Sequence, residues 1–239
     1  MMRKKIQFWI EDVPGLNKLA RYIYMQTIRR YTNYQRNRAF KKEAIEALQA
    51  LQKVFQELNV TYWLEFGTLL GAVREKGFIS HDLDIDIGMF ANDFQDQNET
   101  IFNKYGFRKT CSYSVDGGDY AREETYYFGG VGIDIFYFHM RNQHEIYCHT
   151  FAPIDGKSVD KTIDEVGGLR VRELRYPYTG FRLIDFLGMD FMIPKNVDEH
   201  LTESYGEHWM IKDPNYSNTI ATNARFIKNK IGKRVLNES

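Results

Sequence analysis

Acidic and aliphatic side chains alternate over residues 82–88, and this alternation constrains the fold more than any other feature of the sequence. Successive side chains of a β-strand point to opposite faces of the sheet, so Asp82, Asp84 and Asp86 would share one face. The aliphatic residues between them would share the other face, which can enter a hydrophobic core. The sequence therefore predicts a strand over residues 83–89 that is apolar on one side and acidic on the other.

Carboxylates gathered on one strand face repel one another, and the repulsion raises their pKa values unless a cation lies among them. Mg²⁺ prefers oxygen ligands and is commonly bound by one or two carboxylates together with substrate phosphates. We therefore predict that Asp84 and Asp86 bind Mg²⁺, or Mn²⁺ in its place, beside a phosphate-bearing substrate. The competing interpretation is a solvated acidic face. An EF-hand loop does not fit, because Ile87 stands where that loop requires Gly and Asp93 where it requires Glu.

The segment before the acidic run predicts a strand over residues 60–65, a tight glycine turn and a short helix through about Glu75. Backbone N–H groups at a helix start bind anions, and Gly67 would let the backbone approach a phosphate closely. Thr68 would cap the helix and add a hydroxyl donor. Arg74 would neutralise phosphate charge or, alternatively, form an ion pair with Glu75. These features predict a phosphate-binding turn one short helix before the metal site.

A third acid stands in an otherwise apolar strand expected over residues 131–138. Burying a lone aspartate such as Asp134 is costly without a partner. Asp134 is therefore predicted to complete the metal site or to activate the attacking hydroxyl. The alternative is an aspartate that is satisfied by the backbone or by a Lys or Arg side chain.

Elsewhere the pattern interleaves helices and strands. The clearest helix is expected over residues 40–58, where apolar residues recur at steps of three and four. Further elements are expected as a helix over 92–105, strands over 107–113, 120–128 and 146–151, and a helix over 194–205. Residues 152–180 are polar and predict a loop, and the tail after Tyr216 is basic and weakly patterned. The expected fold is an α/β (α+β) domain around a mixed sheet.

Composition limits the partners and the compartment. Hydrophobic residues make up 43% of the 239, which is enough to form a core, and the zero formal net charge argues against nucleic acid as a partner. Residues 1–42 nevertheless carry eleven Lys and Arg against two acids. They predict a basic helical segment that either docks on the domain or contacts an anionic membrane through residues 1–40. Two cysteines without metal-ligand spacing favour a reducing compartment. With no apolar run of membrane-spanning length, the expected location is cytoplasmic, or peripheral at the inner face of the cell membrane.

Three segments together resemble one family. The run WLEFGTLLGAVREKGFISHDLDIDIGMF is similar to the signature of the LicD/fukutin family of the nucleotidyltransferase-fold superfamily. GIDIFYF resembles the strand of its third acid, and FLGMDFMIPKNVDEHLTESYGEHWMIKDP its C-terminal segment. The resemblance covers roughly residues 42–216. Together with the charge distribution, it predicts three parts, a basic N-terminal segment over 1–39, a family domain over 40–216 and a basic C-terminal tail over 217–239.

The resemblance implies a DNA polymerase β-like core that transfers a phospho-alcohol, such as phosphocholine or ribitol phosphate, from a CDP-alcohol. The implied acceptor is a sugar hydroxyl of a cell-surface or lipid-linked glycan, such as lipopolysaccharide or capsular polysaccharide. Gly67 and Thr68 match the Gly-Ser motif of the superfamily, Asp84 and Asp86 match its metal pair, and Asp134 matches its third acid.

The chain departs from the family pattern immediately before the metal pair. Many members read Pro-Trp-Asp-Asp-Asp where this chain has Ser80, His81, Asp82, Leu83 and Asp84. His81 and Asp82 are still expected to lie near the substrate, although a supporting hydrogen-bonding role for His81 stays open. The departure leaves the identity of the transferred group open. Two other functions also stay open: nucleotidyl transfer to a sugar or small molecule, and an inactive glycan- or nucleotide-binding module.

Overall fold

The computed structural model describes residues 40–80, 82–212 and 223–237. The basic segment 1–39 and its predicted membrane contact, His81, and residues 213–222 lie outside the described residues. The chain divides into two compact units, Met1–Lys42 and Glu43–Ser239, and the site lies in the second. No helix among the described residues is long and apolar enough to cross a membrane.

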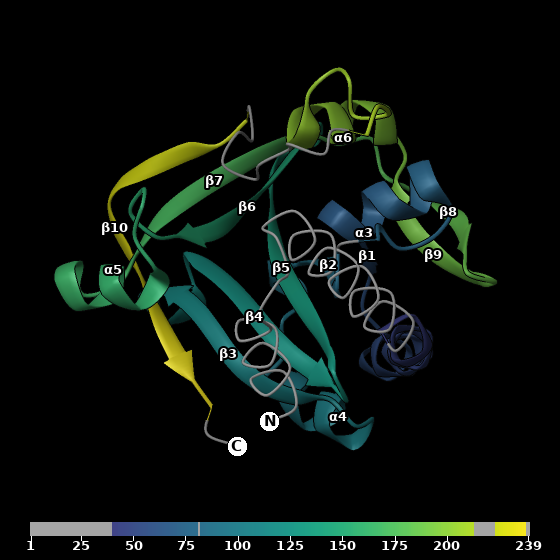
Figure 1. Ribbon diagram of the computed structural model, residues 1–239, viewed down its shortest axis with the longest axis horizontal. Helices are drawn as coiled ribbons and strands as arrows, with labels where there is room; N and C mark the ends of the chain where they lie inside the picture. Colours follow the sequence, from purple (N-terminus) through teal and green to yellow (C-terminus); the bar gives the residue numbers. More distant parts are fainter. Residues whose placement is uncertain (1–39, 81, 213–222, 238–239) are drawn as a thin grey trace, which may run out of the picture. The chain divides into compact units, whose positions relative to one another are not determined.

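Eight strands form the main sheet of the second unit (Figure 1). They are β1 (Tyr62–Leu64), β2 (Asp84–Phe90), β3 (Arg108–Val115), β4 (Ala121–Phe128), β5 (Val131–Asn142), β6 (Glu145–Ala152), β7 (Leu169–Pro177) and β10 (Arg225–Leu236). Their order is β1-β2-β5-β4-β3-β10-β7-β6, and a further pairing of β5 with β6 closes six of them into a ring. Only the β2–β5 pairing is parallel among the described strands, so the sheet is mixed, as predicted, but mostly antiparallel.

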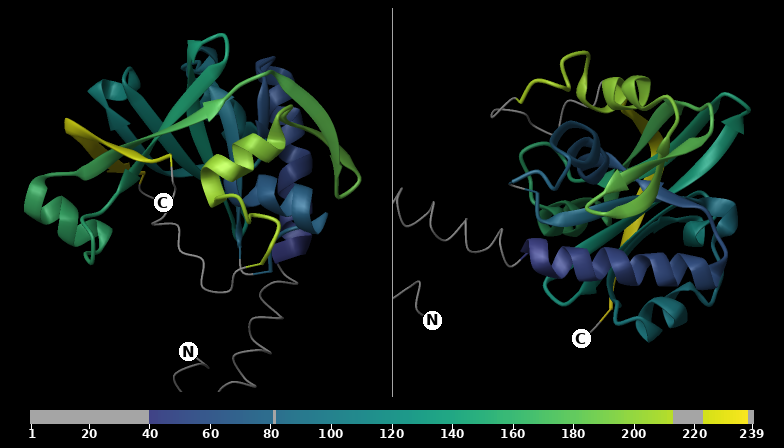
Figure 2. Two further views of the ribbon diagram at one scale, coloured as in Figure 1. Left: turned by 90° about the horizontal axis from the view of Figure 1, so that it is seen from above. Right: turned by 90° about the vertical axis from the view of Figure 1, so that its right-hand side faces the viewer.

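A separate hairpin and several short helices complete the unit. The hairpin consists of β8 (Phe181–Phe186) and β9 (Met189–Pro194). The short elements are α3 (Phe66–Leu70), the π-helix η1 (Gly71–Glu75), the 3₁₀ turns η2 (Ala91–Asp93) and η3 (Asp116–Gly118), α4 (Asn98–Lys104), α5 (Val159–Val166) and α6 (Val197–Tyr205). Helix α6 lies beside α3, although more than 120 residues separate them in the chain (Figures 1 and 2).

The helix predicted over residues 40–58 is confirmed, because all of these residues are helical and the helix ends at Leu58. Its apolar residues from Ala44 onward face the core, and Leu48, Leu51 and Val54 are fully buried. Ile45, which belongs to the same sequence pattern, is instead 37% exposed because it lies at the margin of the apolar stripe. The ring of Phe55 stacks on Tyr62 with centroids 4.0 Å apart, which fixes this helix against β1.

The acidic strand is confirmed as β2, and its aliphatic face lies in the core as predicted. Ile85, Ile87 and Met89 have no exposed surface. On the opposite face, Gly88 makes room for the indole of Trp63 on the neighbouring strand, because a Cβ atom at Gly88 would lie 2.3 Å from Trp63 Cε2. The sequence Asp-Ile-Asp-Ile-Gly thus supplies two carboxylates, two isoleucines that are buried in the core and a glycine that leaves space for the Trp63 ring.

Substituting Gly88 by alanine is expected to destabilise the fold by about 1–3 kcal/mol, because a methyl group placed against the Trp63 ring overpacks the core. Urea unfolding followed by circular dichroism measures this change. Gly77→Ala is the matched control, since only one atom, Glu75 O at 4.0 Å, approaches a Cβ at that position. Equal midpoints for the two variants would contradict the packing argument.

One sequence expectation about regular structure is wrong, because residues 152–180 contain α5 and β7 instead of a loop. The weakly patterned tail contains β10. In β7, Leu169, Val171 and other buried residues alternate with arginines whose long side chains give the segment a polar composition. Strand β10 is paired on both sides, by β3 and β7, so its backbone hydrogen bonds stabilise a strand that its side chains barely predict.

Two helix boundaries also differ from the prediction. Helix α4 begins at Asn98 and not at residue 92, because the Asn98 side chain accepts a hydrogen bond from Gln95 N at 3.3 Å and holds a turn before it. Pro194 ends β9, and α6 begins only at Val197. The hairpin predicted around residues 116–119 is confirmed between β3 and β4.

Candidate active site

A cavity of about 960 Å³ lies over the face of the sheet where β2, β5 and β4 adjoin. Its walls come from α3 and η1, from the loop before β2, from β6 and β7, and from α6 and the residues after it. The described lining residues that carry polar chemistry are Arg74, Glu75, Ser80, Asp82, Asp84, Asp86, Glu123, Asp134, Thr150, Arg172, Tyr176, Ser204, Tyr205, His208, Trp209 and Lys212. Every predicted site acid thus lines one cavity.

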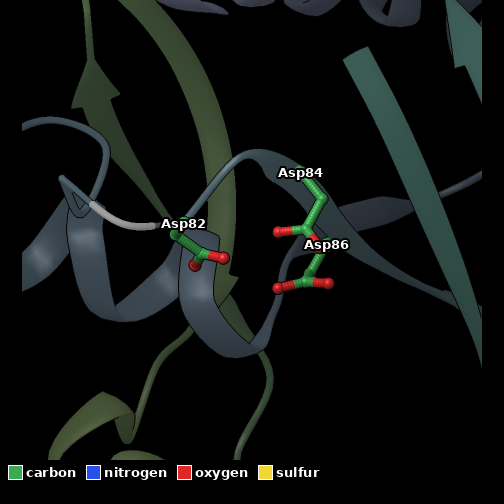
Figure 3. A group of neighbouring side chains, drawn as sticks. All are labelled: Asp82, Asp84 and Asp86. Carbon is green, nitrogen blue, oxygen red and sulfur yellow. The ribbon is translucent and has the colours of Figure 1, made fainter. Parts of the chain in front are cut away.

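Three carboxylates converge at this cavity (Figure 3). Asp82, Asp84 and Asp86 can each offer one oxygen atom such that all three atoms lie within 4.8 Å of one another. Asp84 and Asp86 are on β2, as predicted, but Asp82 lies in the loop before the strand. The loop, and not strand alternation, therefore brings the third carboxylate into the group.

Burial and mutual repulsion raise the pKa values of this group. The pKa of Asp82 is raised to about 8, mainly by burial and then by the neighbouring Asp84 carboxyl and the charge of Asp134. The pKa of Asp86 is raised well above its usual value, mainly by burial and then by the charges of the other three aspartates, although the Gly67 amide opposes this. Carboxylates that ionise unfavourably in the absence of a cation are stabilised in the ionised form by a divalent cation. Hard divalent cations also prefer such oxygen ligands. The acidic group thus fits a metal ion.

Gly67 and Thr68 contact the acidic strand directly. Gly67 N donates to Asp86 Oδ2 at 3.0 Å, and Thr68 Oγ1 accepts from Asp86 N at 2.9 Å. A Cβ at Gly67 would lie 2.0 Å from Asp82 Oδ2, so a larger residue at this position would displace the Asp82 carboxylate. The turn therefore orients the carboxylates. Thr68 is not the helix cap that we expected, because Glu65 caps α3 by accepting from Phe66 N.

Asp134 lies beside the three-carboxylate group and not within it. It is directly opposite Asp86 in the parallel β2–β5 pairing. Thr125 Oγ1, on β4, donates to Asp134 Oδ1 at 2.6 Å. Burial raises the pKa of Asp134 to about 6, against the effect of this hydrogen bond and with the help of the Asp84 charge. Asp134 is thus held by a neutral hydroxyl at the edge of the acidic group.

The guanidinium group of Arg74 bonds to protein groups at the cavity wall. It donates to Glu75 Oε1 at 3.1 Å and to Trp209 O at 3.0 Å. Glu75 also pairs with Lys212 at 2.7 Å. Arg74 therefore connects η1 to the segment after α6. Its ion pair with Glu75 is the arrangement that the sequence offered as the alternative to phosphate binding.

Sequence reasoning missed a buried network behind the glycine turn. Glu65 has no exposed surface and accepts hydrogen bonds from Trp63 Nε1 at 2.7 Å and from Phe66 N at 3.2 Å. His200 Nε2, on α6, lies 2.7 Å from Glu65 Oε1, and the His200 ring stacks on Tyr176. The network surrounds Phe66, whose φ of 41° is unusual for a bulky residue. A glutamate between Leu64 and Phe66 was the signal available in the sequence.

Replacing Glu65 by glutamine is expected to lower the free energy of unfolding by about 2–3 kcal/mol. The amide nitrogen of glutamine would face a donor, either Trp63 Nε1 or Phe66 N, and leave it unsatisfied. Urea unfolding measures the loss, with Glu46→Gln, on an exposed position of the helix over 40–58, as the control. If both variants unfold alike, Glu65 does not stabilise the turn through these bonds.

A second polar group on the cavity wall was also missed. Glu123 on β4, Thr150 on β6 and Arg172 on β7 line the cavity together. The pKa of Glu123 is raised to about 8, chiefly by burial and then by the charge of Asp134. A half-buried glutamate in a strand of the pattern Arg-Glu-Glu-Thr gives no clear sequence signal, because this pattern is typical of a solvent-exposed strand.

Comparison with known proteins identifies the family. The model of the LicD/FKTN/FKRP nucleotidyltransferase domain matches residues 59–196, which is more than half of the chain. The matched range contains Gly67, Asp84, Asp86 and Asp134.

Three relatives of the chain are consistent with the same family. The chain is 26% identical over 228 residues to the ribitol-5-phosphate transferase FKTN of Macaca fascicularis, covering 88% of this chain and 43% of the relative. It is 27% identical over 184 residues to human FKTN, covering 72% of this chain and 34% of the relative. It is 29% identical over 96 residues to the human ribitol 5-phosphate transferase FKRP, covering 37% and 19%. The chain thus spans less than half the length of these relatives. From the match over residues 59–196, the chain belongs to the LicD/FKTN/FKRP nucleotidyltransferase-domain family.

Proposed function

We propose that the protein transfers a phospho-alcohol group from a CDP-alcohol to a sugar hydroxyl of a cell-surface or lipid-linked glycan. Membership of the family and the ribitol-5-phosphate transferases among the relatives support this reaction class. The observation that carries the proposal is the group of three carboxylates beside Asp134 in a single cavity. The strands and helices around this cavity form the proposed nucleotidyltransferase-like core.

The proposed metal ligands are Asp84, Asp86 and Asp134, and the ion is Mg²⁺ or Mn²⁺. The close approach of Asp82 to the first two adds a further oxygen donor to this set. A bound divalent ion supplies neutralisation of the diphosphate charge and orientation of the leaving CMP. Gly67 and Thr68 hold Asp86 in place, which reduces the reorganisation needed when the ligand set is completed.

Asp134 is proposed to accept the proton of the attacking sugar hydroxyl. The Thr125 hydroxyl fixes its Oδ1 atom, so the carboxyl group is held with Oδ2 as the atom to take the proton. The new bond forms between the sugar oxygen and the phosphorus bearing the alcohol, while the bond from that phosphorus to the CMP oxygen breaks.

The donor is tested by thermal shift with CDP-choline, CDP-ribitol, CDP-glycerol, CTP and ATP in Mg²⁺, with EDTA as control. A ligand that binds only the native state raises its apparent stability. We expect metal-dependent stabilisation by one CDP-alcohol and, with a glycan acceptor, a product heavier by the phospho-alcohol. Stabilisation by a nucleoside triphosphate and a product carrying the nucleotide would replace this proposal with nucleotidyl transfer.

We also propose that the protein is cytoplasmic and lies peripherally at the inner face of the cell membrane. The basic residues 1–40 would bring the enzyme to a lipid-linked acceptor. Flotation with anionic liposomes, for the full chain and for a chain that lacks residues 1–40, tests this contact. Equal flotation of both proteins would exclude it.

A further inference from the structure

The glycine turn before β2 holds Asp86 through its carboxylate and through both of its backbone polar groups. The carboxylate accepts from Gly67 N at 3.0 Å, and the backbone N–H of Asp86 donates to Thr68 Oγ1 at 2.9 Å. The backbone carbonyl of Asp86 accepts from Glu65 N at 3.0 Å. The position of this proposed metal ligand therefore depends on the conformation of residues 65–68.

That turn contains a strained residue. Phe66 has a φ of 41°, in the left-handed region, and a bulky residue keeps this conformation only when its surroundings hold it there. The ring of Phe66 packs edge to face against Phe136 with centroids 4.5 Å apart, and its N–H donates to Glu65 Oε1 at 3.2 Å. Because Gly67 is the next residue, any relaxation of the Phe66 backbone would move the N–H that bonds to the Asp86 carboxylate.

The side chain of Glu65 fixes this turn from behind. It has no exposed surface, and its Oε2 atom accepts from Trp63 Nε1 at 2.7 Å. Its Oε1 atom accepts from Phe66 N and lies 2.7 Å from His200 Nε2. An ionised carboxylate only accepts, so His200 Nε2 is the third donor to this group. The carboxylate thus joins the turn to a histidine 135 positions along the chain.

His200 is itself held rigidly on α6, the helix beside α3 (Figure 1). It has no exposed surface, and its ring stacks on Tyr176 with centroids 4.0 Å apart and planes 14° from parallel. Hydrogen bonds to a charged group are strong where water is excluded. Neither Glu65 nor His200 lines the cavity, so neither side chain is placed to touch a substrate.

We propose, resting on the metal site of the function proposed above, that Glu65 and His200 are positioning residues for Asp86. Their hydrogen bond holds Phe66 in its left-handed conformation, so the amide of Gly67 stays directed at the Asp86 carboxylate. Hydrogen-bonded groups behind a metal ligand fix its orientation, and their loss typically weakens metal binding by about 10–100-fold. Helix α6 is thereby part of the metal site, although it supplies none of the proposed ligands.

Calorimetric titration of the full chain with Mn²⁺ tests the inference. Leucine fills a similar volume but offers no N–H, so we expect His200→Leu to bind Mn²⁺ about tenfold more weakly than the wild type. The side-chain amide of glutamine can donate from the position of the imidazole Nε2, so His200→Gln should stay within about twofold of the wild type.

The control for a loss of stability alone is Val197→Ala, on the same helix. Val197 is buried, so the substitution removes core volume and destabilises α6 without changing a side-chain hydrogen bond. Urea unfolding measures the stability of each variant. We expect Val197→Ala to unfold more easily than the wild type and to bind Mn²⁺ with the same affinity.

A second measurement needs no variant and decides the inference if His200→Leu does not fold. Coupling between two sites is reciprocal, so an ion that binds at Asp86 must act on the pair that positions it. We expect Mg²⁺ to shift the imidazole nitrogen resonances of His200 in NMR spectra of the wild type. The resonances of His149, which is buried on β6 and does not line the cavity, should not move.

The outcomes separate this inference from the proposed function. Equal Mn²⁺ affinities for His200→Leu and the wild type would overturn the positioning role and leave the metal site intact. An equal loss of affinity in Val197→Ala or in His200→Gln would also overturn it, because the loss would then not follow the hydrogen bond to Glu65. Resonances of His200 that Mg²⁺ leaves unmoved would do the same. Failure of the wild type to bind either ion would refute the metal-dependent function, and the positioning role with it.

Discussion

The Asp86→Asn variant will lose transferase activity by about a thousandfold or more and will nevertheless fold. Loss of one carboxylate ligand removes much of the affinity for the metal ion, and the charge stabilisation that the ion provides is worth several kcal/mol in the transition state. Asparagine keeps an oxygen that can accept from Gly67 N, so the local structure has no reason to change. Turnover of a CDP-alcohol with and without Mg²⁺ is the measurement.

In the absence of metal, the same variant should be at least as stable as the wild type, which is unusual for a substitution at a buried position. Burial and three neighbouring carboxylates make ionised Asp86 unfavourable, so replacing it with a neutral group relieves repulsion. In EDTA, the melting temperature of Asp86→Asn should therefore equal or exceed that of the wild type. Asp96→Asn, at an exposed position outside the cavity, should change neither activity nor stability. An active Asp86→Asn variant would exclude Asp86 as a metal ligand.

Without a metal ion, the protein is expected to lose stability as the pH rises from about 6.5 to 8. In this range the unfolded aspartates, with ordinary values near 3.8, are already ionised, while Asp82, with a pKa of about 8, keeps its proton in the folded state. Glu123 behaves in the same way. The folded state then binds more protons than the unfolded state, so its stability falls with rising pH. Below pH 6.5 the trend is opposed by His149, whose pKa burial lowers to about 4.

Melting temperatures in EDTA and in saturating Mg²⁺, at half-unit pH steps, measure this dependence. We expect a fall of about 5 °C in EDTA, and a smaller fall in Mg²⁺ because the ion replaces the protons. Asp82→Asn should flatten the EDTA curve, while the exposed-site variant Asp96→Asn should follow the wild type. Identical curves with and without Mg²⁺ would show that no cation binds at these carboxylates.

Local sequence pattern determined the parts of the site that depend on neighbouring residues. The alternation from Asp84 to Met89 was sufficient to predict both β2 and its two faces, because side-chain direction in a strand follows from residue parity alone. The burial cost of a lone acid was sufficient to mark Asp134, and helical periodicity was sufficient for the helix over residues 40–58. Each inference needed only a few consecutive residues.

Tertiary structure decided whatever depended on partners distant in the chain. The pairing of β7 with β10 within the ring satisfies backbone groups of two segments, residues 152–180 and the tail, whose sequences predict no strand, and no local pattern encodes such a pairing. His200 meets Glu65 across 135 positions, and Glu123 and Arg172 reach one cavity from different strands. Even Asp82 joins Asp84 and Asp86 through the path of a loop and not through strand parity. Sequence parity fixes the direction of a side chain within one element, whereas only the packing of elements brings side chains from separate elements within hydrogen-bonding distance.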